Sequence, residues 1–229
     1  PQWSAGSYLE CGTAGERAGI TGSVCLRHRP EDGIDDLFVH ADYDAATRTG
    51  RLRVEAQPGA VVRVPELGLE LQAGETATIP GVEPWSAEVP RLYQANVGSG
   101  GPGSAETVRI ALGFRTIAIQ DATLLSNGVP LRLRGVDWAP AADKARADLE
   151  LMKRHNVNAV RIRGCADTRV LDLCDEYGLW VLDEFGLDTR GFERVGWRRT
   201  PGAEPAWREA LLDRASRTLE RDKNHPCVL

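Results

Sequence analysis

The hydrophobic pattern changes its period near residue 120, and this change constrains the fold more than any other feature of the chain. Before that point, short runs alternate apolar and polar side chains, and Gly, Pro or acidic residues separate one run from the next. Strands with this spacing are typical of an antiparallel β-sandwich. The first half therefore predicts an immunoglobulin-like sandwich. Its expected strands are residues 37–43, 51–56, 60–64, 69–72, 76–79, 91–97 and 106–112.

After residue 120, strand-like runs alternate with runs of helical period. Strands are expected at 131–136, 157–162 and 179–184, and a fourth is expected to begin at Cys227. Strands that alternate with helices build a parallel sheet. Three βα units followed by the start of another strand predict the first part of a (β/α)₈ barrel, a TIM barrel.

The helices between these strands have recognisable ends. Asp143 is expected to cap the first helix and Asp167 the second, and Gly178 is expected to end the second. A third helix is expected to follow a long loop. The apolar faces expected for the three helices are Ala145, Leu149 and Met152; Val170, Cys174 and Tyr177; and Trp207, Leu211, Ala215 and Leu219.

Polar residues gather where the predicted parallel strands end, which is where a barrel of this kind carries its functional groups. They are Asp137 and Trp138 after the first strand, Arg161 and Arg163 after the second, and Asp183, Glu184 and Asp188 at and beyond the third. Carboxylates, a guanidinium and an indole suit the binding of a sugar. Asp183 and Glu184 are neighbours on a strand and must point to opposite faces, so they cannot form a catalytic dyad. The alternative is a structural ion pair, with Arg161 as partner.

Composition excludes several classes of partner. The formal net charge of −5 argues against a nucleic acid, and no apolar run is long enough to cross a membrane. The cysteine count is odd, at five, and the spacing of the cysteines fits no metal site, which favours a reducing compartment such as the cytoplasm.

Several motifs together resemble glycoside hydrolase family 2, of the β-galactosidase type. R-G-V-D (134–137), L-M-K-R-H-N-V-N-A-V-R (151–161), L-C-D-E-Y-G-L-W-V-L-D-E (173–184) and E-R-D-K-N-H-P-C-V-L (220–229) match the opening of the family's barrel in order and spacing. P-W-S-A-E-V-P-R-L-Y (84–93) fits its middle sandwich. G-S-Y-L-E (6–10) and G-I-T-G-S-V (19–24) resemble the close of its sugar-binding jelly roll.

The resemblance implies three parts: residues 1–29 as the tail of a jelly roll, residues 30–120 as the sandwich, and residues 121–229 as an incomplete TIM barrel. It implies hydrolysis of terminal β-glycosidic bonds with retention, on a small β-galactoside-like substrate. Both catalytic Glu residues are then expected beyond Leu229, so this chain carries no catalytic residue of its own. Asp137, Trp138, Arg161, Asp183 and Glu184 become candidate substrate-binding residues.

The chain also departs from the family pattern. The family binds Mg²⁺ through a Glu and a His that correspond here to Asp188 and Arg190, and its galactose-contacting Asp corresponds to Thr13. An Arg at a ligand position repels a metal ion, so we expect no cofactor in this chain, with Asp188 as the one surviving ligand. Two hypotheses stay open. The first is a hydrolase lineage whose intact members often form homo-oligomers. The second is a degenerate, non-catalytic relative that acts as a carbohydrate-binding or structural module.

Overall fold

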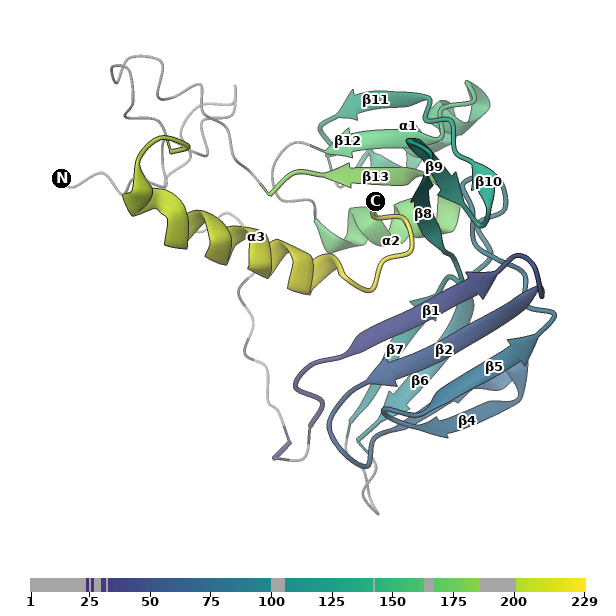
Figure 1. The fold of residues 1–229 in the computed structure, drawn as a ribbon. Helices are drawn as coiled ribbons and strands as arrows, with labels where there is room; N and C mark the ends of the chain where they lie inside the picture. Colours follow the sequence, from purple (N-terminus) through teal and green to yellow (C-terminus); the bar gives the residue numbers. More distant parts are fainter. Residues whose placement is uncertain are drawn as a thin grey trace.

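The computed structural model describes positions 24 and 26 and residues 30–31, 33–99, 106–141, 143–162, 167–185 and 201–229. Figure 1 shows two antiparallel sheets at one end of the molecule and a parallel sheet with helices at the other. The expected jelly-roll tail, residues 1–29, lies outside the described residues except for positions 24 and 26. No helix among the described residues is long and apolar enough to cross a membrane.

Seven strands form the antiparallel half, and each coincides with a strand expected from the alternating pattern. One sheet has the order β1-β2-β5 and the other β4-β3-β6-β7, with every neighbouring pair antiparallel. The strands are β1 (Phe38–Asp44), β2 (Thr49–Glu55), β3 (Val61–Val64), β4 (Leu69–Gln72), β5 (Thr76–Pro80), β6 (Tyr93–Gly98) and β7 (Thr107–Leu112). A 3-10 helix (Pro65–Leu67) joins β3 to β4.

Alternation along these strands builds the core of this half. In β2, Leu52 and Val54 are fully buried while their neighbours in sequence are exposed, and β3 repeats the pattern with Val62 and Val64. These side chains meet those of the other sheet in one cluster whose buried members all come from residues 34–114. The antiparallel half therefore has a hydrophobic core made entirely of its own residues.

A small third sheet follows, which the periodicity did not reveal. β8 (Ile117–Gln120), β9 (Thr123–Ser126) and β10 (Val129–Pro130) pair antiparallel in the order β10-β9-β8. Asn127 and Gly128 have φ of 51° and 78°, the left-handed conformation that a tight hairpin turn requires. The expected boundary at residue 120 falls at the end of β8, which pairs with β9 and not with the sandwich.

The second half is a parallel sheet in sequence order. β11 (Gly135–Trp138), β12 (Ala159–Ile162) and β13 (Trp180–Asp183) pair in parallel, and α1 (Ala145–Arg154) and α2 (Thr168–Tyr177) connect them. The chain returns beside β13 at its C-terminal end: Val181 N donates to Cys227 O (2.8 Å) and Leu229 N donates to Val181 O (3.0 Å). This parallel bridge matches the fourth strand expected to begin at Cys227.

The helix ends agree with the sequence in two places and differ in one. Asp167 caps α2 by accepting a hydrogen bond from Arg169 N, and Gly178 ends α2 with φ of 72°. The expected cap at Asp143 is wrong. A turn in which Lys144 N donates to Ala141 O makes Lys144 the cap residue, already in helical conformation, so α1 begins without a side-chain cap.

The last helix, α3 (Arg208–Asp222), follows a 3-10 helix (Pro205–Trp207) and buries a different face from the one expected. Leu219 is 68% exposed, whereas Thr218 and Asp222 are buried. The expected apolar face that includes Leu219 is therefore wrong at its C-terminal end. At this end of the helix, Asp222 pairs with Arg221 and Lys223 pairs with Asp36.

The two halves meet through buried aromatic rings and hydrogen bonds. Trp85, from the loop after β5, packs edge-on against Trp180 of β13 with ring centroids 4.7 Å apart, and both rings are fully buried. Lys153 of α1 donates its ammonium hydrogens to Ala87 O (2.6 Å) and Gly178 O (2.9 Å). The core of the α/β half includes Trp85 and Ala87, so this core is completed by the sandwich half.

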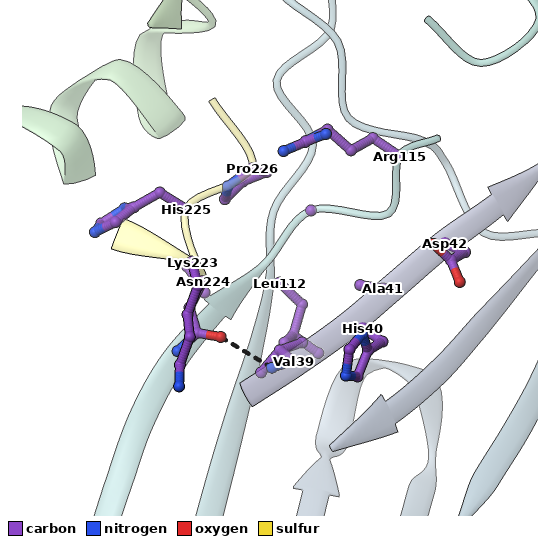
Figure 2. A pocket seen from close by; sticks show the side chains of 12 residues that line it. Val39, His40, Ala41, Asp42, Leu112, Arg115, Lys223, Asn224, His225 and Pro226 are labelled. Atoms are coloured by element: carbon purple, nitrogen blue, oxygen red, sulfur yellow. Dashed lines mark hydrogen bonds between the residues drawn. The ribbon is translucent and has the colours of Figure 1, made fainter. Parts of the chain in front are cut away.

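A second contact between the halves lies beside a cleft of about 150 Å³ between β1 and residues 223–226, shown in Figure 2. Asn224 Oδ1 accepts a hydrogen bond from Val39 N (2.9 Å), and Asn224 Nδ2 donates to Leu37 O (2.7 Å). Lys223 forms an ion pair with Asp36 at 2.7 Å. The segment after α3 is thus hydrogen-bonded to the first strand of the sandwich.

Candidate functional site

Three charged side chains meet at the C-terminal ends of the parallel strands. Arg161, on the central strand β12, lies in register with Asp137 of β11. Its Nη1 is 3.6 Å from Asp137 Oδ1, its Nε donates to Glu184 Oε1 at 2.5 Å, and its Nη2 also contacts Glu184 Oε1. The side chains of Arg161 and Asp137 are about half exposed, and that of Glu184 is 35% exposed. We call Asp137, Arg161 and Glu184 the strand-end triad.

Strand alternation explains why these residues share a face. Successive side chains of a strand point to opposite faces, so the triad lies on one face and Trp138, Ile162 and Asp183 lie on the other. Trp138 Nε1 donates to Asp148 Oδ2 of α1 (3.1 Å), which identifies the Trp138 face as the helix-covered one. The triad therefore projects from the face that α1 does not cover.

Trp138 was expected to offer an aromatic face to a sugar, and its position does not support that role. The side chain is only 7% exposed and belongs to the buried core of the α/β half. Its indole N–H is already bound to Asp148. The residue follows Asp137 directly, and alternation turns it from the triad face into the core.

Asp183 and Glu184 separate as alternation requires. Glu184 joins the triad, while the Asp183 side chain turns to α3 and is 6% exposed. Burial raises the pKa of Asp183 to about 7, and the neighbouring carboxyl of Asp222 adds to the effect. Asp183 is therefore placed away from the open face where a substrate would meet the triad.

The expected metal ligand, Asp188, lies outside the described residues, as do Arg163, Arg190 and Thr13. The donor set itself fits Mg²⁺ poorly. Mg²⁺ takes oxygen ligands in near-octahedral geometry, and the position expected to supply its second ligand carries Arg190, whose guanidinium would repel a cation.

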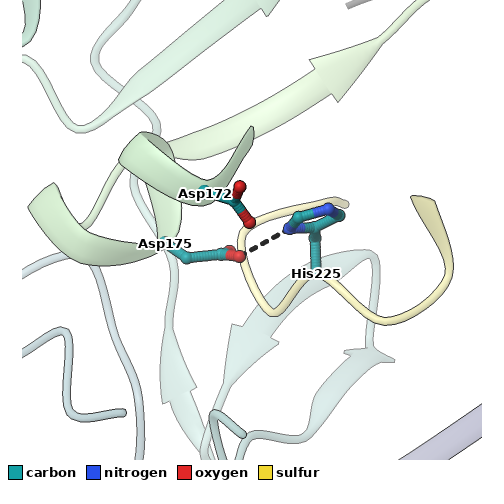
Figure 3. A group of neighbouring side chains, drawn as sticks. All are labelled: Asp172, Asp175 and His225. Atoms are coloured by element: carbon teal, nitrogen blue, oxygen red, sulfur yellow. Dashed lines mark hydrogen bonds and ion pairs between the residues drawn. The ribbon is translucent and has the colours of Figure 1, made fainter. Parts of the chain in front are cut away.

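The structure also brings together a cluster that sequence reasoning missed. Asp172 and Asp175 of α2 lie beside His225, with potential ligand atoms within 4.8 Å of one another (Figure 3). Asp175 Oδ2 is 2.6 Å from His225 Nδ1, and its Oδ1 accepts a hydrogen bond from Cys227 N (2.9 Å). Because both oxygens of the buried Asp175 already have partners, the cluster ties the C-terminal segment to α2. The N-H-P motif at 224–226 was the only sequence signal for it.

Comparison with known proteins bears on this geometry. The profile described as "Glycosyl hydrolases family 2, TIM barrel domain" matches residues 117–229. A β-galactosidase of Arthrobacter sp. (strain B7) is 43% identical over the whole chain, and a β-galactosidase of Streptococcus thermophilus is 32% identical over the whole chain. The chain covers 24% and 26% of these two proteins, so it spans about a quarter of their length.

Solved structures share the fold at lower identity. A β-D-glucuronidase of Dictyoglomus thermophilum superposes with a TM-score of 0.73 at 20% identity, covering 86% of this chain and 37% of that one. A β-glucuronidase of Ruminococcus gnavus superposes with the same TM-score and identity, covering 85% and 36%. A barrel-domain profile over the α/β half and curated relatives aligned along the entire chain, which are β-galactosidases, lead to one conclusion: this chain belongs to glycoside hydrolase family 2.

Proposed function

We propose that this chain is the middle part of a hydrolase acting on terminal β-galactosides, in which the strand-end triad lines the entrance to the substrate site. The observation that carries the proposal is Arg161, which bridges Asp137 and Glu184 at the C-terminal ends of three parallel strands. That edge of a βα sheet is where such folds place their chemistry.

The proposed architecture follows from the same placement. The sandwich, which we take as immunoglobulin-like, is followed by the opening strands of a TIM barrel, β11, β12 and β13, with residues 227–229 beginning the next. A retaining glycosidase needs two carboxyl groups about 5 Å apart. We place both beyond Leu229 and none within the triad, because Arg161 already pairs with both of the triad carboxylates.

Within this proposal the triad binds and orients the sugar substrate. A guanidinium held between two carboxylates fixes their positions, and carboxylate oxygens accept hydrogen bonds from sugar hydroxyls. Substrate orientation of this kind lowers the barrier by positioning the reacting bond. We propose a reducing compartment, the cytoplasm, because Cys174 and Cys227 are buried free thiols.

A chimaera tests the proposal. The aligned quarter of the Arthrobacter relative is replaced by this chain, and hydrolysis of a chromogenic β-galactoside is measured, with a β-glucuronide as the competing substrate. We expect hydrolysis of the galactoside and a loss of about ten- to hundredfold in kcat/KM in Arg161→Ala. The matched control is Arg109→Ala, an exposed arginine on β7 of the sandwich, which should leave kcat/KM unchanged.

The outcomes separate the two hypotheses left by the sequence. A chimaera that folds, shown by a cooperative thermal transition, and still hydrolyses neither substrate would support the degenerate, non-catalytic relative. Preference for the glucuronide would overturn the proposed substrate class but leave the hydrolase intact. Equal losses of kcat/KM in Arg161→Ala and Arg109→Ala would mean that the triad does not belong to the substrate site.

A further inference from the structure

Two aspartates from distant parts of the chain lie beside one guanidinium, that of Arg221, behind the triad. Asp183 is the last residue of β13 and Asp222 is the last residue of α3. Their side chains are 6% and 3% exposed. Both carboxyl groups are therefore almost entirely removed from water, where an ionised carboxylate without a partner is strongly destabilised.

Among the described residues, one guanidinium contacts both carboxyl groups, and it is bound mainly to one of them. Arg221 donates from Nε to Asp222 Oδ1 (2.6 Å) and from Nη2 to Asp222 Oδ2 (2.5 Å). Its Nη2 is 3.7 Å from Asp183 Oδ2, which is beyond hydrogen-bonding distance. Both oxygens of Asp183 are buried and accept no hydrogen bond from any described residue.

The remaining charges do not supply the missing donor. The groups that act on Asp183 within the described part of the chain are Asp222 and Arg221 of α3 and Glu184 on its own strand, and Glu184 adds a further negative charge. His225 interacts electrostatically with Asp222, but its Nδ1 is hydrogen-bonded to Asp175. Asp167, which also acts on Arg221, is paired with Arg169.

We propose that Asp183 and Asp222 share one proton at neutral pH. This shared proton holds the end of α3 against the end of β13, behind the strand-end triad, and makes their contact sensitive to pH. The hydroxyl of one carboxyl group donates to an oxygen of the other, which supplies the donor that Asp183 lacks. The charge then balances, because one proton and one guanidinium face two carboxyl groups. The inference does not depend on the proposed hydrolysis.

Loss of the proton has a predictable direction. Two ionised carboxylates that share one guanidinium repel each other, so the end of α3 separates from β13 as the pH rises. Burial, followed by the neighbouring Asp222, raises the pKa of Asp183 to about 7, which places this release near neutral pH. Glu184 follows Asp183 directly in the chain and binds Arg161. We therefore expect the separation of α3 from β13 to shift the Glu184 carboxylate as well.

The alternative occupant of such a pair is a divalent cation. Mg²⁺ or Ca²⁺ would need six or more oxygen ligands, and the guanidinium of Arg221 already binds both oxygens of Asp222. The described residues therefore favour a proton over a metal ion, and the experiment below distinguishes the two.

The direct test is infrared spectroscopy of the 229-residue chain with ¹³C-labelled aspartate, titrated from about pH 5 to about pH 9. We expect a protonated carboxyl C=O band that disappears with a midpoint near the pKa of about 7. The band should be absent from Asp183→Asn, and its midpoint should fall in Asp222→Asn, which removes the second carboxyl group but leaves Asp183 buried. The band should persist in Asp213→Asn, a control at an exposed ion pair of the same helix.

Urea unfolding over the same pH range gives an independent readout. The folded state holds a proton that the unfolded chain releases near pH 4. The shared proton therefore stabilises the fold fully below about pH 4, and this contribution to the free energy of unfolding is lost as the pH rises to about 7. The unfolding constant of the parent chain should rise by up to about tenfold per pH unit across that window. Asp183→Asn, whose amide can donate to Asp222 at every pH, should remove this rise, and Asp213→Asn should retain it.

Three outcomes would overturn the proposal. The first is the absence of a protonated carboxyl band above about pH 6. The second is a pH dependence of unfolding that is unchanged in Asp183→Asn and, should that variant not fold, in Asp222→Asn. The third is saturable stabilisation by Mg²⁺ or Ca²⁺ that both Asn variants abolish, which would identify a cation as the shared partner.

Discussion

The imidazole Nδ1 of His225 lies 2.6 Å from Asp175 Oδ2, and this pair fastens the C-terminal segment to α2. Both side chains are largely buried. Burial of the ring opposes its charged form, but the hydrogen bond and the negative charge of Asp175 outweigh it, so the pKa of His225 is raised. The same carboxylate accepts the backbone N–H of Cys227, so one side chain holds two points of the segment.

Asp175→Asn should destabilise the chain by about 3 kcal/mol at mildly acidic pH, because it leaves a buried imidazolium without its counter-charge. Since the folded-state pKa of His225 is raised, the stabilisation is complete below the unfolded value of about 6.5 and is lost as the pH rises through the folded value. Urea unfolding at several pH values should therefore show the difference from the parent chain shrinking at alkaline pH. His155→Gln, at an exposed histidine, should show no such trend.

Gly178→Ala should be among the most damaging single substitutions. The residue has φ of 72°, and an added Cβ would lie 2.5 Å from the carbonyl oxygen of Ala87 in the sandwich half. Conformational strain and the clash together should cost about 2–5 kcal/mol in the free energy of unfolding.

Gly68→Ala separates these two effects. Gly68 has φ of 59°, but an added Cβ would meet nothing within 4 Å. Its cost should stay near the conformational strain of about 1–2 kcal/mol. Equal losses in the two variants, measured by chemical unfolding, would mean that the close approach of Ala87 to Gly178 contributes nothing.

Trp138→Ala should reduce stability much more than Arg161→Ala, because Trp138 lies in the core and Arg161 on the open face of the sheet. Arg161 belongs to half-exposed ion pairs, whose loss costs about 1 kcal/mol or less. Trp138 is part of the core, and its truncation should cost about 3–5 kcal/mol. A Trp138→Ala variant as stable as the parent chain would show that the indole is not needed for packing.

Residues 121–229 should aggregate when expressed alone, whereas residues 30–120 should fold independently. The α/β core needs Trp85 and Ala87 from the sandwich half, while the sandwich core uses only its own residues. The α/β part also carries the exposed apolar side chains Val136, Leu182 and Phe185 on or next to its parallel strands, and strand edges without a partner promote aggregation. Light scattering and a hydrophobic dye test this, and a monomeric α/β fragment with a cooperative unfolding transition would contradict it.

Local pattern was enough to predict most of the secondary structure. Period-two alternation predicted all seven strands of the sandwich, because each strand has one buried and one exposed face. Strand–helix alternation predicted three parallel strands, although the first lies at Gly135–Trp138 and not at the expected 131–136, and Asp167 and Gly178 predicted both ends of α2. Alternation alone also separated Asp183 from Glu184. These features depend on residues close together in the chain, so the sequence determined them by itself.

Tertiary structure decided what depends on distant segments. Trp138 is buried in the core of the α/β half, with its indole bound to Asp148 of α1. The turn of α3 away from Leu219 and the Asp175–His225 and Asp183–Asp222 pairs arise where α2, α3, β13 and the C-terminal segment come together. Whether a polar side chain is exposed or buried, and therefore whether its pKa is ordinary or raised, is set by neighbours that no local pattern reveals. The sequence placed Asp183 on a strand end, and only packing against α3 removed it from water and gave it a partner with which to share a proton.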